Sequence, residues 1–114
     1  MIYTGYFGGW QLYPGDIVKI AVTRFPPAMW NYAVWGELAP SEGLLKSYKN
    51  KDIDEYMFKL KYLRELDDRG LTPESVRQKI VKQYTNRDVI LMCYERPTDF
   101  CHRHILAEWL GGDP

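Results

Sequence analysis

Three runs of apolar and β-branched residues predict the strands of this 114-residue chain. The runs cover residues 2–4, 17–23 and 89–94, and turn-forming Gly, Pro and Asp residues lie near them. The second and third runs are apolar at nearly every position, which is typical of strands that are covered on both faces. The sheet is therefore expected to be buried between other elements.

The rest of the chain carries the apolar spacing and the end signals of amphipathic helices. Asp52 is a suitable N-cap for one helix, and Thr72 followed by Pro73 predicts the start of the next. Asp99 or Thr98 is expected to cap the last helix. The predicted helices span residues 40–48, 52–70, 72–84 and 99–111.

These elements predict a single small α/β domain over residues 1–114, with a mainly parallel sheet of about three strands packed by helices. Helices separate the strands at 17–23 and 89–94, so a parallel crossover is expected between them. The link between the first two strands is roughly a dozen residues, near the lower limit for a crossover, which leaves their relative direction open. Residues 28–38, rich in Trp and Tyr, show no clear period and predict irregular structure.

Composition and charge narrow the classes of function. The chain is 46% hydrophobic and 26% charged, as in ordinary globular proteins. Fifteen basic and fifteen acidic side chains give a formal net charge of +0, whereas proteins that wrap duplex DNA usually carry a basic excess. No apolar run is long enough to span a membrane, and no leader is visible, so a cytoplasmic location is expected. Two cysteines are too few for a disulfide framework, and reduced thiols are expected.

The strand ends predict where a ligand would bind. In parallel α/β sheets, ligands collect beyond the carboxyl ends of the strands. Tyr6 lies in the glycine-rich segment after the first strand, and Arg24 follows the second. Arg103 lies in the first turn of the last helix, where free N–H groups favour anions. We therefore expect Tyr6, Arg24 and Arg103 to bind a small anionic ligand.

Three further residues at this edge are candidates for catalysis: Glu95, Cys101 and His102. A partly buried Glu95 could act as a general acid or base, and Cys101 at a helix start could be a nucleophile. Each has a structural alternative. Glu95 could pair with Arg24, Cys101 could be a small core residue, and His102 lies on the apolar stripe of its helix, as a hydrogen-bonded core histidine would.

A metal site is not expected, and no cofactor is predicted. Cys93, Cys101, His102 and His104 fall within twelve residues. However, there is no Cys-x-x-Cys pair and no second ligand pair elsewhere in the chain. His102 and His104 are two positions apart on a helix and point in different directions.

Four segments resemble a known family. They cover residues 2–7, 38–50, 91–95 and 100–110, and the most specific part is Cys-Tyr-Glu at 93–95 followed by Cys-His-Arg at 101–103. They are similar to the bacterial and phage family catalogued as domain of unknown function number 488. The resemblance implies a small α/β fold and a bacterial or phage cytosolic origin, and it implies no established reaction. Members often carry Asp or Ser-rich sequence before the arginine of the second strand, whereas this chain has Val22 and Thr23. The family's signature positions map to Arg24, Cys93, Glu95, Cys101, His102 and Arg103.

Three functions follow as hypotheses. The first is a small enzyme or ligand-binding domain for a phosphorylated or carboxylated molecule, nucleotides included. The second is a nucleic-acid module that stacks unpaired bases on Trp10, Trp30 or Trp35, which net charge does not support. The third is a protein-binding adaptor. Enzymatic activity and oligomeric state stay open.

Overall fold

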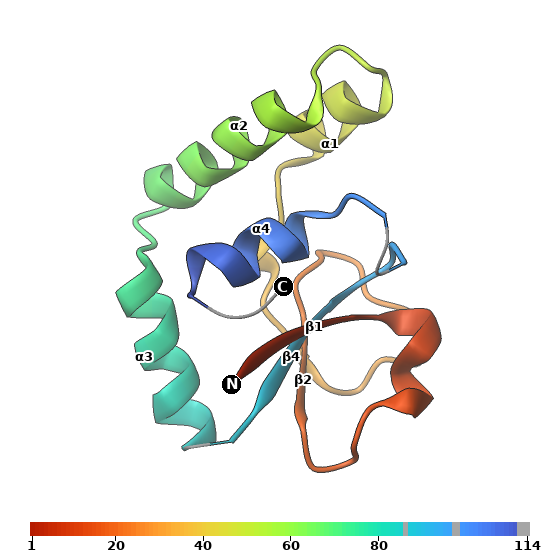
Figure 1. Ribbon diagram of the computed structural model, residues 1–114, viewed down its shortest axis with the longest axis vertical. Helices are drawn as coiled ribbons and strands as arrows, with labels where there is room; N and C mark the ends of the chain where they lie inside the picture. Colours follow the sequence, from red (N-terminus) through yellow and green to blue (C-terminus); the bar gives the residue numbers. More distant parts are fainter. Residues whose placement is uncertain (86, 97–98, 112–114) are drawn as a thin grey trace.

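A parallel sheet forms the centre of the computed structural model, which describes residues 1–85, 87–96 and 99–111 but not the side chains of residues 10–12. Within these residues, four strands form one sheet in the order β1-β4-β2-β3, and every neighbouring pair is parallel (Figure 1). The α/β class and the parallel sheet are thus confirmed, with one strand more than expected. The strands are β1 (Ile2–Tyr6), β2 (Val18–Ala21), β3 (Ala33–Val34) and β4 (Val89–Cys93).

β4 lies at the middle of this sheet, between β1 and β2. Tyr6 at the end of β1 is opposite Cys93, and Ala21 at the end of β2 is opposite Met92. Because β1 and β2 both run parallel to β4, they are parallel to each other, although they are not neighbours. β3 lies in the segment predicted to be irregular, since two residues are too few to give an alternating pattern.

The two faces of the sheet are covered differently. Alternate side chains of the strands, such as Ile20 and Leu91, contact the helices, whereas Ile90 and Met92 face a second cluster that includes Phe7. Figure 1 shows α4 lying against the sheet, with α1 and α2 beyond it. The helices are α1 (Glu42–Lys49), α2 (Glu55–Asp68), α3 (Pro73–Tyr84) and α4 (His102–Trp109), with 3-10 turns η1 (Phe7–Leu12) and η2 (Gly36–Leu38).

Of the three helix N-caps predicted from the sequence, one is confirmed and two are wrong. Thr72 caps α3 as predicted, with its hydroxyl accepting from Ser75 N at 3.1 Å. The predicted cap of α2 was wrong: Asp54, not Asp52, caps it, because the Asp54 carboxylate accepts from the Met57 N–H at 2.8 Å. Each of these caps satisfies a backbone N–H that the helix leaves unpaired.

The predicted cap of α4 was also wrong. The N-cap position is Cys101, which has no side-chain cap hydrogen bond. Asp99 instead takes part in a turn, in which its N–H donates to the carbonyl of Arg96 at 3.0 Å. Thr98, the alternative cap, lies outside the described residues. The start of α4 is therefore set by contacts of its first residues with the sheet.

Residues that lead into α1 are held by polar contacts from α2. Glu65 accepts hydrogen bonds from Ser41 N at 2.8 Å and from Ser41 Oγ at 2.5 Å. Arg69 donates to the carbonyl of Ala39 at 2.6 Å, and Tyr62 donates to the carbonyl of Leu38 at 2.5 Å. These bonds fix the position of the start of α1 relative to α2.

We expect Glu65→Ala to lower the free energy of unfolding by about 1–3 kcal/mol, because it leaves the half-buried Ser41 donors and Arg69 without this carboxylate. Urea denaturation measures the change. Asp68→Ala, which removes an exposed acid near the end of the same helix, is the matched control and should change stability by less than about 0.5 kcal/mol. Equal stability of the two variants would contradict the anchoring role of Glu65.

Candidate functional site

The ends of β2 and β4 meet at the carboxyl edge of the sheet. Because Ala21 is opposite Met92, Arg24 and Glu95 each lie three residues beyond a paired position. The backbone stays together past the strands, since Val22 N donates to the Met92 carbonyl at 3.0 Å. Tyr94 then donates from its hydroxyl to the carbonyl of residue 25 at 2.6 Å. The segments that carry Arg24 and Glu95 are therefore adjacent, as the strand ends predicted.

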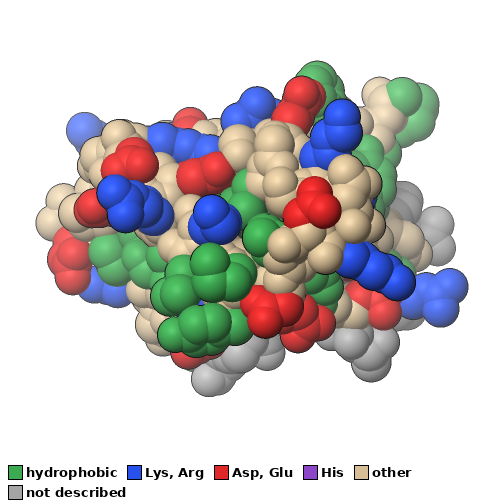
Figure 2. Space-filling view, turned by 90° about the horizontal axis from the view of Figure 1, so that it is seen from above, with side chains coloured by type: hydrophobic (Ala, Val, Ile, Leu, Met, Phe, Trp, Pro, Cys, Tyr) green, Lys and Arg blue, Asp and Glu red, His purple; other side chains and the backbone are tan. Residues whose placement is uncertain are grey.

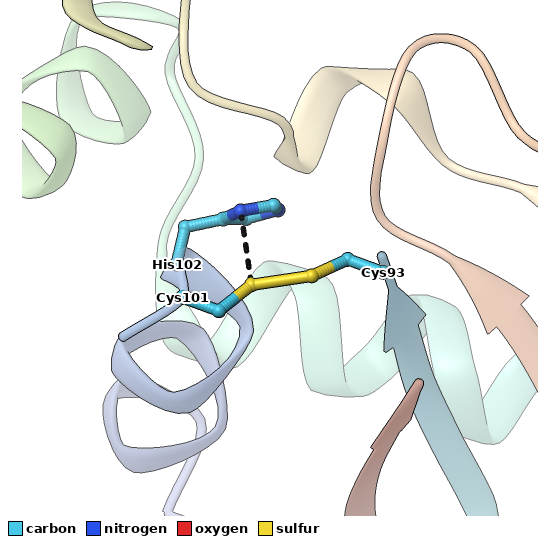
Figure 3. A group of neighbouring side chains, drawn as sticks. All are labelled: Cys93, Cys101 and His102. Atoms are coloured by element: carbon cyan, nitrogen blue, oxygen red, sulfur yellow. Dashed lines mark hydrogen bonds between the residues drawn. A yellow bond between two sulfur atoms is a disulfide. The ribbon is translucent and has the colours of Figure 1, made fainter. Parts of the chain in front are cut away.

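The start of α4 is attached to both strand ends. A disulfide joins Cys93 at the end of β4 to Cys101 at the start of α4 (Figure 3). The His102 ring contacts the Val22 carbonyl with Nε2 at 2.6 Å, beyond the end of β2. These contacts bring three segments of the chain to one point.

This disulfide corrects the prediction of reduced thiols. Both cysteines are buried and bonded, so Cys101 is not a free nucleophile in this state. Eight positions separate Cys93 from Cys101 in the sequence, and such a spacing does not reveal contact. The sulfurs meet because α4 packs back onto β4 at the strand end.

His102 is a buried, neutral imidazole. Its Nε2 carries the proton, because a carbonyl oxygen such as that of Val22 only accepts hydrogen bonds. Nδ1 therefore presents its lone pair, and it lies 3.7 Å from Cys101 Sγ. Burial lowers the pKa of His102 to about 4; the Val22 bond opposes this shift, and the charges of Arg103 and His104 add to it. This is the environment of the hydrogen-bonded core histidine.

Arg103 is enclosed by the site. Its side chain is 0% exposed, and Nη1 donates to Cys93 Sγ at 3.0 Å. Burial lowers the pKa of the guanidinium, and the nearby Glu95 carboxylate opposes that shift most strongly. No described residue accepts a hydrogen bond from Nε or Nη2. Arg103 therefore faces the disulfide, so binding of a ligand by this residue stays a prediction.

Glu95 is exposed, and its Oε2 lies 2.9 Å from Cys93 Sγ. A sulfur in a disulfide carries no proton, so this contact becomes a hydrogen bond only after reduction. Among the ion pairs of the described residues, none joins Glu95 to Arg24. Its role as a general acid or base stays a prediction.

A cavity of about 420 Å³ lies next to His102 at this edge. Arg24, Lys46 and Lys49 line it, with Glu42 as the acidic side chain. The strand ends predicted Arg24 but gave no indication of Lys46 and Lys49. Their spacing of three residues puts both on one side of α1, and that is the signal that could have pointed to them.

Tyr6, the remaining candidate for ligand binding, covers the glycine-rich segment. A Cβ atom at Gly9 would lie 2.7 Å from the Tyr6 ring, and one at Gly8 would lie 3.0 Å from it. A side chain at Gly9 would therefore require the Tyr6 ring to move, and one at Gly8 would be in tight contact with it. Contact of Tyr6 with a ligand stays a prediction.

Trp30 and Trp35, two of the three tryptophans expected to stack on bases, offer little free surface for it. Trp35 is 6% exposed and stacks on Tyr84. Trp30 is half-buried, and its Nε1 donates to the carbonyl of Ala33 at 3.0 Å. The side chain of Trp10 lies outside the described residues.

The charges on one face of the molecule are mixed. Figure 2 shows basic and acidic side chains interspersed over this face, without separation into one sign. Among the described residues, no helix is both long and apolar enough to cross a membrane. The mixed charges on the face shown do not form the broad basic surface that binds a polyanion.

The fold and this edge define a small parallel α/β domain with a Cys-His-Arg helix start at the carboxyl ends of its strands. The model of the active DUF488-N3 subclade matches residues 8–112, and the chain belongs to the DUF488 family. The resemblance inferred from the sequence is thereby confirmed. The match contains every site residue named above except Tyr6. No curated protein and no solved structure matches the chain.

The low pKa of His102 predicts a loss of stability in acid. Folding lowers this pKa from 6.5 to about 4, so between these values the unfolded chain binds more protons and protonation favours unfolding. The lowered pKa of His102 reduces the free energy of unfolding in acid. This reduction is absent above pH 6.5, grows as the pH falls toward 4, and amounts to roughly 3 kcal/mol.

Urea denaturation of wild type and His102→Gln, each at pH 7 and pH 4, measures this effect. Glutamine keeps an N–H donor for the Val22 carbonyl but does not titrate, so the variant should lose less stability between the two pH values. His104→Gln is the comparison from the same helix: it removes only the smallest of the causes that lower the His102 pKa, so it should keep most of the pH dependence of the wild type. The same pH dependence in wild type and His102→Gln would contradict the assignment.

Proposed function

We propose that this chain binds a small phosphorylated or carboxylated molecule in the cavity at the carboxyl edge of the sheet. The observation that carries the proposal is the lining of that cavity, in which Arg24, Lys46 and Lys49 are opposed by the one acid Glu42. The chain as a whole has a formal net charge of +0. A local basic excess therefore distinguishes the cavity from the average surface.

The side chains suit the recognition of an oxyanion. The guanidinium of Arg24 can donate two parallel hydrogen bonds to a phosphate or carboxylate. Lys46 and Lys49 add point charges from flexible stems. The hydroxyl of Thr23, which also lines the cavity, can donate or accept a further bond. Together these groups favour an anionic group over a neutral one.

The size of the cavity limits the ligand to a small molecule. A volume of about 420 Å³ lies in the range of roughly 300–1,000 Å³ that small-molecule sites occupy. Apolar side chains, Phe25 and Leu45 among them, line another part of it. A nucleotide or a sugar phosphate, which joins an anionic group to a less polar body, fits this distribution.

An enzymatic use of the edge is a further part of the proposal, and the matching subclade is described as active. Glu95 is the candidate for the general acid or base, because its carboxylate is exposed where β4 ends. Cys101 becomes a candidate nucleophile after its disulfide is reduced. The buried Arg103 then acts by holding Cys93 in place.

Isothermal titration calorimetry with nucleotides, sugar phosphates and small carboxylates tests this function. We expect at least one of these ligands to bind, with an affinity that falls as salt is raised. Arg24→Ala should weaken binding at least tenfold, and Lys46→Ala should weaken it less, because it removes one point charge. Arg64→Ala and Lys61→Ala, on the exposed surface of α2, are the matched controls and should bind as the wild type does.

Two results would contradict the proposal. One is the absence of binding for all three ligand classes at low salt. The other is binding that Arg24→Ala weakens no more than Arg64→Ala does. Quenching of tryptophan fluorescence by a single-stranded oligonucleotide in place of these ligands would favour the base-stacking hypothesis.

A further inference from the structure

Four atoms with lone pairs converge where β4 ends and α4 begins. The ligand atoms of Cys93, Cys101 and His102 all lie within 4.8 Å of one another, and all three residues are buried. Figure 3 shows the imidazole of His102 lying beside the two sulfurs. A carboxylate oxygen of Glu95 is 2.9 Å from Cys93 Sγ. These groups come from two segments of the chain, which is why the spacing within α4 did not predict a metal site.

In the disulfide state, none of these four atoms carries a proton that it could donate to another of them. The sulfurs of Cys93 and Cys101 are bonded to each other, and His102 uses its N–H on the Val22 carbonyl. An ionised Glu95 carboxylate can only accept. Cys93 Sγ receives a hydrogen bond from Arg103, whereas Cys101 Sγ and His102 Nδ1 face each other as buried acceptors at 3.7 Å. Such acceptors repel unless a proton or a cation lies between them. The arrangement therefore matches a state with thiols or with a bound cation.

The spacing suits a tetrahedral ion. With bonds of about 2.3 Å to sulfur and about 2.0–2.1 Å to nitrogen, a tetrahedral zinc site places sulfur roughly 3.6 Å from nitrogen. Cys101 Sγ and His102 Nδ1 are 3.7 Å apart. The Cα atoms of Cys93 and Cys101 are 7.9 Å apart, which leaves room for the reduced sulfurs to separate to roughly 3.8 Å around an ion.

The groups around these atoms would support metal binding. The nitrogen of a metal-binding histidine that does not touch the metal usually donates to a carbonyl or a carboxylate, as His102 Nε2 does to Val22. Arg103 Nη1 donates to Cys93 Sγ at 3.0 Å from a fully buried position. This bond would stabilise a thiolate at Cys93.

We propose that, after reduction of the Cys93–Cys101 disulfide, the two thiolates and His102 Nδ1 bind one divalent ion of the zinc class. Glu95, whose Oε2 lies 2.9 Å from Cys93 Sγ, is the candidate for the fourth position. Two thiolates, one carboxylate, a divalent ion and the Arg103 guanidinium then have a formal sum of zero. Thiolate and imidazole ligands select zinc over magnesium or calcium, which prefer oxygen. This site does not require the anion cavity to be functional.

Reduction of the Cys93–Cys101 disulfide requires a dithiol reductant. The dithiol gives two electrons and two protons to the disulfide, so that its own two sulfurs become bonded and Cys93 and Cys101 become thiols. The ion then displaces the two thiol protons to solvent as the thiolates coordinate. In the reverse direction a disulfide oxidant accepts two electrons and two protons and becomes a dithiol, while the Cys93–Cys101 bond forms again and the ion is released.

Cobalt(II) is the probe for this site, because it occupies zinc sites and its spectrum reports thiolate ligands. The wild-type protein is reduced with a dithiol, separated from the reductant without oxygen, and titrated with Co²⁺. We expect one ion per chain, with visible bands of tetrahedral Co²⁺ and thiolate-to-metal charge transfer in the near ultraviolet. Excess Zn²⁺ should remove these bands. The oxidised protein should show neither band.

His102→Asn and Cys93→Ser should each weaken Co²⁺ binding at least tenfold. His104→Asn is the matched control from the same helix and should leave binding unchanged. The proposal is overturned if reduced wild type shows no charge-transfer band, or if His102→Asn and His104→Asn bind Co²⁺ equally.

A readout on the wild type alone keeps the test decisive where a substitution prevents folding. Stoichiometric Zn²⁺ should raise the Tm of the reduced protein and leave the Tm of the oxidised protein unchanged. An equal effect of Zn²⁺ on the two states, or no effect on the reduced state, overturns the proposal. Because neither readout includes an anionic ligand, this result and the result for the anion cavity are independent.

Discussion

The site depends on the pairing of β4 with a strand on each side. All five residues of β4 are buried, and its backbone bonds are shared between β1 and β2. A strand held in this way fixes the direction in which the chain leaves the sheet. The carboxyl ends of β2 and β4 consequently stay together, and Cys93 occupies the last paired position of β4. A shift in this register would turn buried side chains to the opposite face of the sheet.

Helix α4 contacts the sheet in two ways. Apolar residues of α4, such as Leu106, contact the helix-covered face of the sheet. Its first residues instead make polar and covalent contacts, through Cys101 to Cys93 and through His102 to Val22. These contacts attach the first turn to the sheet, although the helix has no side-chain N-cap. The chemistry of the site and the attachment of the last helix rest on the same residues.

Charge is distributed unevenly around this edge. Arg103 lies buried beside Cys93, whereas Arg24 and the lysines of α1 line an open cavity. The buried arginine is therefore suited to control the state of a sulfur, and the cavity is suited to attract an anion from solvent. His102 contacts both places, because it lines the cavity and faces Cys101 with Nδ1. His102 therefore lies between the sulfurs and the cavity.

The sequence by itself determined the elements that carry their own local signals. The apolar runs of β2 and β4, the amphipathic spacing of α2 and the Thr72–Pro73 start of α3 depend on neighbouring residues, so each could be predicted from the chain. The general place of the site followed because parallel strands end at a common edge. The tertiary structure alone decided the rest. The contact of Cys93 with Cys101, the enclosure of Arg103, the strand β3 and the share of Lys46 in the cavity all depend on segments that meet in space. The spacing of neighbouring residues does not predict such contacts, because they depend on how segments far apart in the sequence pack together.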